Sequence, residues 1–152
     1  MSPIKVYLAA FATVSLIVGI CFSFSLYLYF GVSEALRMVG VSVEGVNIIT
    51  DGSDAIETVV TIENPSEFTL GIVFFEQNLR LNGHEIGTKW LSVSENHPIV
   101  VAQFSSVNVT LTYSASVSPA PSDQWIVTVL MVVSNPLPSP IRLYFYNLRY
   151  SS

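Results

Sequence analysis

The sequence predicts an all-β protein, an antiparallel sandwich of about seven strands, preceded by one N-terminal transmembrane α-helix. The run from Val6 to Phe30 contains no charged residue, and beyond residue 38 apolar and polar residues alternate between clusters of turn-forming residues. A helix needs roughly 20 apolar residues to cross a bilayer, and alternation is typical of a half-buried strand. We therefore expect a cytoplasmic N-terminus (1–5), a transmembrane helix (6–30), a short linker (31–38) and an extracytoplasmic sandwich (39–152).

The apolar run favours a retained anchor over a cleaved signal. A signal core is usually only about 7–15 residues long, and this run is longer. Tyr7, Tyr27 and Tyr29 lie near its ends, where aromatic rings favour the lipid headgroups. The small residues of 33–35 keep cleavage by a signal peptidase open as the alternative. Because Lys5 precedes the run and Glu34 follows it, the positive-inside rule favours a cytoplasmic N-terminus and an external C-terminal domain.

Small residues recur on one face of the predicted span. Ser15, Gly19 and Ser23 stand four residues apart, and this spacing permits close approach of a second transmembrane helix. Serine and glycine are also ordinary residues within a span, so the pattern alone leaves both interpretations open.

Alternation and turn residues divide the remaining chain into strands. Between Val107 and Ser114 apolar residues alternate strictly with polar ones, whereas the segment 125–133 is apolar on both faces, as expected of a central strand. Glycine, proline and asparagine clusters separate the strands because proline cannot donate to a ladder and glycine tolerates positive φ. The expected strands are 39–49, 55–63, 71–82, 87–93, 99–113, 124–134 and 141–150.

If the strands follow immunoglobulin-like order, two Asn-Pro loops lie at the end of the domain where the anchor enters. These loops follow the second and sixth expected strands. We therefore expect their apolar residues to face lipid or a membrane-embedded neighbour; they are Phe68, Leu70, Leu137 and Pro138.

The composition limits the chemistry. A net charge of −5 and a pI near 4.8 disfavour nucleic acid, whose phosphates would be repelled. The single cysteine, Cys21, lies within the apolar run, so no internal disulfide can form. His84 and His97 each lie near a glutamate, but neither a closely spaced His pair nor a cysteine cluster accompanies them. We expect no metal, no cofactor and no enzymatic activity.

Two surface features point to other partners. The final strand, 141–150, combines aromatic residues with arginine, a composition enriched at protein interfaces and also normal in cores. We expect Tyr144, Tyr146 and Tyr150 to contact a partner. Asn108-Val109-Thr110 is an N-glycosylation sequon on the polar face of its strand, which makes Asn108 a candidate acceptor.

The segment between Glu57 and Ser116 resembles the late embryogenesis abundant type-2 family, also called the water-stress and hypersensitive-response domain. The matching pattern is TVVTIENPSEFTLGI, then VFFEQNLRLNGHEIGT, then VNVTLTYSA. The resemblance implies a fibronectin-like or immunoglobulin-like sandwich, often membrane-tethered and associated with desiccation or other stress. The proline-dense corner at 135–140 departs from the family pattern. No catalytic residue is carried over.

Together these features predict a non-catalytic, membrane-tethered binding, structural or stress-protection module. Its expected partners are the lipid bilayer and another membrane or surface protein. The alternatives are an accessory single-pass subunit of a larger complex and an extracellular appendage subunit.

Overall fold

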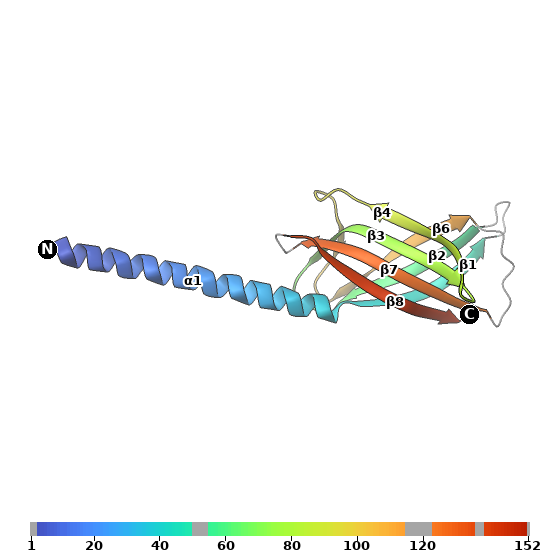
Figure 1. The fold of residues 1–152 in the computed structure, drawn as a ribbon, viewed down its shortest axis with the longest axis horizontal. Coiled ribbons are helices and arrows are strands. Elements are labelled where there is room, and N and C mark those ends of the chain that lie inside the picture. The colour runs from blue at the N-terminus through green and yellow to red at the C-terminus, as the bar shows by residue number, and fades with distance from the viewer. Residues whose placement is uncertain (1–2, 50–54, 115–122, 136–138, 152) are drawn as a thin grey trace.

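The computed structural model describes residues 3–49, 55–114, 123–135 and 139–151. Within these residues one long helix projects from one end of a two-layered β domain (Figure 1). The helix is α1 (Pro3–Met38). The strands are β1 (Gly40–Ile49), β2 (Ala55–Asn64), β3 (Leu70–Leu81), β4 (His84–Ser92), β5 (Ile99–Val101), β6 (Ser105–Ser114), β7 (Gln124–Asn135) and β8 (Ile141–Ser151).

The strands form two antiparallel sheets. The three-stranded sheet has the order β1-β2-β6, and the five-stranded sheet has the order β4-β3-β7-β8 with β5 also paired to β3. β4 and β5 lie along the same side of β3, because β5 pairs with its first residues and β4 with the remainder. The predicted all-β class with antiparallel sheets is confirmed.

The strand periodicity also follows the prediction. In β6, Val109 and Tyr113 are buried while Thr110 and Thr112 are exposed. The β3–β4 connection is a tight turn in which Asn82 and Gly83 have φ values of 50° and 84°. Positive φ at both positions is what a two-residue hairpin with right-handed strand twist requires.

The expected single strand 99–113 is wrong, because it is divided into β5 and β6. β5 pairs with β3 in the five-stranded sheet, whereas β6 pairs with β2 in the three-stranded sheet. The chain must therefore turn between the layers, and it does so at Phe104, whose φ is 50°. The described residues thus contain eight strands instead of seven.

The expected helix end at residue 30 is also wrong. The segment 31–38, expected to be a linker, is the final part of α1. Val32, Ala35 and Leu36 are buried there, and their spacing of three and four residues places them on one helix face. Burying this face against the domain stabilises the helix beyond the apolar run.

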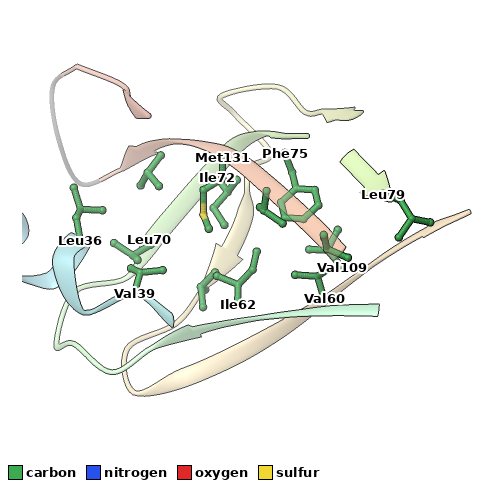
Figure 2. Packing of buried hydrophobic residues seen from close by; sticks show 14 of the residues in the cluster. Leu36, Val39, Val60, Ile62, Leu70, Ile72, Phe75, Leu79, Val109 and Met131 are labelled. Carbon is green, nitrogen blue, oxygen red and sulfur yellow. The ribbon is translucent and has the colours of Figure 1, made fainter. Parts of the chain in front are cut away.

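The core joins both sheets and the end of α1 (Figure 2). Ile62 and Val60 contribute from the three-stranded sheet, and Phe75 and Met131 from the five-stranded sheet, with all four essentially inaccessible. Leu36 and Val39 lie at the same end of the core as Leu70 (Figure 2). The helix and the β domain therefore share one hydrophobic core.

A buried polar bridge crosses between the sheets. Gln77 Nε2 on β3 donates a 2.8 Å hydrogen bond to Thr58 Oγ1 on β2, and Thr58 Oγ1 donates to Leu111 O at 3.2 Å. The hydroxyl of Tyr113 donates to Gln77 O at 3.0 Å, and burial raises the pKa of this hydroxyl far above its ordinary value. Among the residues the structure describes, Gln77 Oε1 lacks a hydrogen-bond partner although the side chain is fully buried.

Candidate functional site

The candidate site is the end of the β domain where α1 enters, which we call the junction. It consists of the last turns of α1, the β2–β3 connection (residues 65–69) and the β5–β6 crossover (residues 102–104). These segments are far apart in sequence, and the register of the two sheets brings them together. β7 also ends here, because Asn135 pairs with Gly71 at the start of β3.

Direct contacts join α1 to the β2–β3 connection. The Tyr27 hydroxyl donates a 3.2 Å hydrogen bond to Glu67 Oε1. A Cβ atom added to Gly31 would lie 2.9 Å from Cζ of Phe68, closer than Cβ atoms come to other atoms in real proteins. A side chain at position 31 would therefore displace the ring of Phe68 from its place against the helix.

Asn64, the asparagine of the first Asn-Pro corner, holds the two loops of the junction together. Its side chain is 1% exposed, and its Nδ2 lies 2.6, 3.2 and 3.0 Å from the carbonyl oxygens of Phe68, Val101 and Ala102. Its Oδ1 accepts from the backbone N–H and the hydroxyl of Ser66 at 3.2 and 2.6 Å. The sequence marks this residue as a turn former, but only the tertiary structure shows that it joins the β2–β3 connection to the crossover.

Phe104 is a junction residue that the sequence analysis missed. Its side chain is 71% exposed, and its backbone N–H donates to Ser66 O at 3.0 Å. It lines a shallow recess with Gly31, Glu34 and Phe68. No glycine, proline or asparagine stands at 102–104, so no turn signal marks this position.

The residues predicted to lie near the membrane have different positions in the structure. Phe68 lies in the junction and is partly buried. The prediction for Leu70 is wrong, since this side chain is 1% exposed and packs in the core as the first residue of β3, paired with Val101. Leu137 and Pro138 lie outside the described residues.

The rest of α1 exposes apolar side chains. One 18-residue window of the helix has a mean hydropathy of 2.2 and is 0% buried, so α1 is long and apolar enough to cross a membrane. A secretory signal sequence shares these properties. The Thr13 and Ser25 hydroxyls each donate a 2.9 Å hydrogen bond to a backbone carbonyl one turn earlier, as suits an apolar medium. Ser15, Gly19 and Ser23 are exposed on this helix.

The outer face of the five-stranded sheet carries large exposed side chains. Tyr144 and Tyr146 are 49% and 66% exposed, with parallel rings whose centroids lie 5.9 Å apart. Strand register places Tyr144 beside Leu130, Leu130 beside Glu76, and Glu76 beside Trp90. Trp90 is 66% exposed. Three largely exposed aromatic side chains among the described residues, Trp90, Tyr144 and Tyr146, therefore mark this face, and sequence analysis identified two of them.

Tyr150 does not lie with the other two tyrosines. It is partly buried and packs against the core opposite Trp125. Asn147 has a φ of 54° where the register of β7 and β8 shifts. The extra residue of this bulge reverses the alternation, so Tyr150 points inward although its spacing from Tyr146 is even.

The other residues noted in the sequence are not among those that form the junction. Asn108 is exposed, and its Oδ1 accepts a 2.8 Å hydrogen bond from Thr61 Oγ1. His84 begins β4, and His97 lies in the β4–β5 connection. Over residues 3–49, 55–114, 123–135 and 139–151, no three His, Cys, Asp or Glu side chains come together in a way that could hold a metal ion.

Comparisons with known proteins identify a fold. No family model matches the chain, and no curated protein matches it in sequence. A solved structure of a protein proposed to be late embryogenesis abundant is similar, with a TM-score of 0.54, 10% identity, and coverage of 93% of this chain and 87% of that one. Weaker similarity extends to a protein from Bordetella pertussis that is proposed to be ApaA (TM-score 0.48, 13% identity, 74% and 92% coverage). It also extends to a protein from Archaeoglobus fulgidus (TM-score 0.44, 10% identity, 75% and 94% coverage).

Proposed function

We propose that this chain is a single-pass, membrane-tethered β-sandwich of the late embryogenesis abundant type-2 kind, immunoglobulin-like or fibronectin-like in its strand order. It acts without catalysis, through surface contacts at the extracytoplasmic face of a membrane, as a binding, structural or stress-protection module. The fold similarity to a protein proposed to be late embryogenesis abundant supports the family part of this proposal.

One observation supports the proposal that α1 is retained as a membrane anchor. The exposed apolar part of α1 continues without interruption into turns that are buried in the domain core. A cleaved signal is removed with its apolar segment, whereas cutting near residues 33–35 would here remove Val32 from the core. Loss of this buried packing would destabilise the domain, which favours an anchor that is retained.

Two measurements test the tether and its orientation. We expect the full-length protein to resist alkaline extraction from membranes and to require detergent. In a Cys21→Ser background, an Ile48→Cys variant should react with a membrane-impermeant maleimide in intact cells, because Ile48 is 42% exposed near the end of β1 remote from α1. Recovery of the chain in the aqueous fraction would contradict the tether, and labelling only after cell lysis would contradict the external orientation.

The stress-protection role needs a separate assay. Vesicles that hold the reconstituted protein should retain an enclosed dye through drying and rehydration better than vesicles that hold the isolated span peptide. Equal dye loss from both would contradict protection while leaving the tether intact.

The stacked tyrosines favour a second candidate, an accessory subunit of a larger membrane complex. Exposed, ordered aromatic rings are enriched at interface hot spots. Gentle detergent extraction followed by sizing should then give a large particle, and replacing Tyr144 and Tyr146 by serine should release the chain from it. Ile48→Ser, which removes an exposed apolar side chain from the other sheet, is the matched control. A small particle from the wild-type chain would reject this candidate, and fibres would instead indicate an appendage subunit.

A further inference from the structure

Phe104 combines exposure with an unusual backbone conformation. Its ring is 71% exposed, and its φ of 50° lies in the left-handed region. A bulky side chain is rarely found there, whereas glycine and asparagine accept this conformation readily. The turn between β5 and β6 would therefore form more easily with a different residue.

The surrounding structure fixes this backbone firmly. The Phe104 N–H donates to Ser66 O, and the carbonyls of Val101 and Ala102 accept hydrogen bonds from the buried Asn64. Strained residues held in this way by their surroundings often serve a function beyond folding. The hydrogen bonds account for the turn, but they do not account for a large apolar ring that is exposed at this position.

The position of Phe104 relative to α1 suggests a role for the exposed ring. Phe104 lines the same recess as Gly31, which directly follows the apolar run from Val6 to Phe30. The Tyr27 hydroxyl one turn earlier reaches Glu67 of the neighbouring loop. If α1 spans a bilayer, its apolar run ends at this level, so the recess lies among the lipid headgroups, where aromatic rings are favoured.

We infer that Phe104 inserts its ring into the headgroup region of the bilayer that α1 crosses, as a second membrane contact of the domain. This inference rests on the proposed tether. A protein partner fits the recess poorly, because a stable interface buries about 800 Å² on each side and involves roughly 20 residues. A single ring is sufficient at a lipid surface, since α1 already provides the anchor. Glu34 and Glu67 line the same recess, so zwitterionic headgroups match its charge better than anionic ones.

Site-directed spin labelling in phosphatidylcholine vesicles tests the contact. Three single-cysteine proteins are compared: the native chain labelled at Cys21, and Phe104→Cys and Ile48→Cys in a Cys21→Ser background. We expect the label at 104 to collide more often with oxygen and less often with a water-soluble nickel complex than the label at 48, by a several-fold change in their ratio. This ratio should persist when the protein is diluted in lipid.

The outcomes separate the inference from the proposed function. A lipid-exposed label at 21 with a water-exposed label at 104 would overturn the inference alone, and a water-exposed label at 21 would overturn the tether as well. Loss of the lipid signature at 104 on dilution would show contact with a second copy and would also overturn the inference.

A variant that keeps the turn separates membrane contact from folding. Phe104→Asn should unfold at the same or a higher denaturant concentration than the wild-type chain, because asparagine suits the left-handed backbone. A lower midpoint would show that the ring stabilises the domain itself, which would contradict the inference.

Discussion

Replacing Asn64 by alanine should uncouple the two loops of the junction and destabilise the domain strongly. The amide of Asn64 donates two hydrogens toward three carbonyl oxygens, and its Oδ1 accepts from the N–H and the hydroxyl of Ser66. At about 1 kcal/mol of net stability for each hydrogen bond, four bonds contribute about 4 kcal/mol. Buried groups that lose their partner add to the loss.

The expected loss is large relative to the stability of a domain of this size. A stability of about 5–15 kcal/mol is usual for a single domain, and each 1 kcal/mol changes its melting temperature by roughly 4 °C. Asn64→Ala should therefore lower the melting temperature by roughly 15 °C. Asn64→Asp keeps the shape and the acceptor but removes the donor, so it should destabilise the domain at neutral pH as well.

Guanidinium unfolding of the full-length chain in detergent measures this loss. The fluorescence of Trp125, which is 3% exposed, reports unfolding of the domain when the exposed Trp90 is replaced by phenylalanine. Asn108→Ala is the matched control, because it removes one exposed hydrogen-bond acceptor from the same domain. If Asn64→Ala lost no more stability than this control, about 1 kcal/mol or less, Asn64 would not be the link between the loops.

Three further substitutions test the core and the junction. Burial raises the pKa of Tyr113 in the folded state, so the buried neutral hydroxyl makes its full contribution to stability below the ordinary tyrosine pKa of 10.0. As the pH rises above 10.0, the free energy of unfolding should fall by up to about 1.4 kcal/mol per pH unit, because the hydroxyl then ionises in the unfolded chain. Tyr113→Phe should remove this pH dependence in unfolding experiments. Gln77→Met removes the buried amide oxygen that lacks a partner in the described structure together with the hydrogen bond from Nε2 to Thr58, two opposing effects of about 1 kcal/mol each, so stability should change by less than about 1 kcal/mol in the same experiment, and a larger loss would show that the amide is needed. Gly31→Val forces the ring of Phe68 to move and should destabilise the junction by about 1–3 kcal/mol, whereas Gly19→Val, with nothing within 4 Å of its added Cβ, should leave stability unchanged; equal effects of the two would contradict the close contact.

The sequence predicted those features of the fold that depend on local patterns. Alternation identified β6, and a glycine and asparagine cluster marked the break between the expected strands 71–82 and 87–93, because side-chain periodicity and backbone freedom act over a few residues. The division between β5 and β6 was missed because residues 102–104 carry no turn former. The change of sheet there is determined by pairing with β3 and β2, which lie far away in sequence.

In the junction, too, local features were predicted from the sequence and long-range contacts were not. The Asn-Pro corner was recognised as a turn, but the partners of Asn64 lie up to 38 residues away in the chain and cannot be identified from local sequence. The helical extension to Met38 did have a signal, the spacing of Val32, Ala35 and Leu36. This helical signal was missed because the segment 31–38 was interpreted as a linker.

The shared core of helix and domain has a consequence for how the protein presents its surfaces. A flexible linker would allow the β domain to take many orientations relative to the bilayer, and each contact would then lose entropy when it formed. Here α1 continues to Met38, and Leu36 belongs to the same hydrophobic core as Leu70, so the orientations open to the domain relative to the helix are restricted. In a membrane, this coupling would hold Phe104 toward the lipid headgroups and would leave the face with Tyr144 free for a lateral partner. The two proposed contacts therefore use different surfaces of the domain, and a substitution in either surface should leave the other contact unchanged.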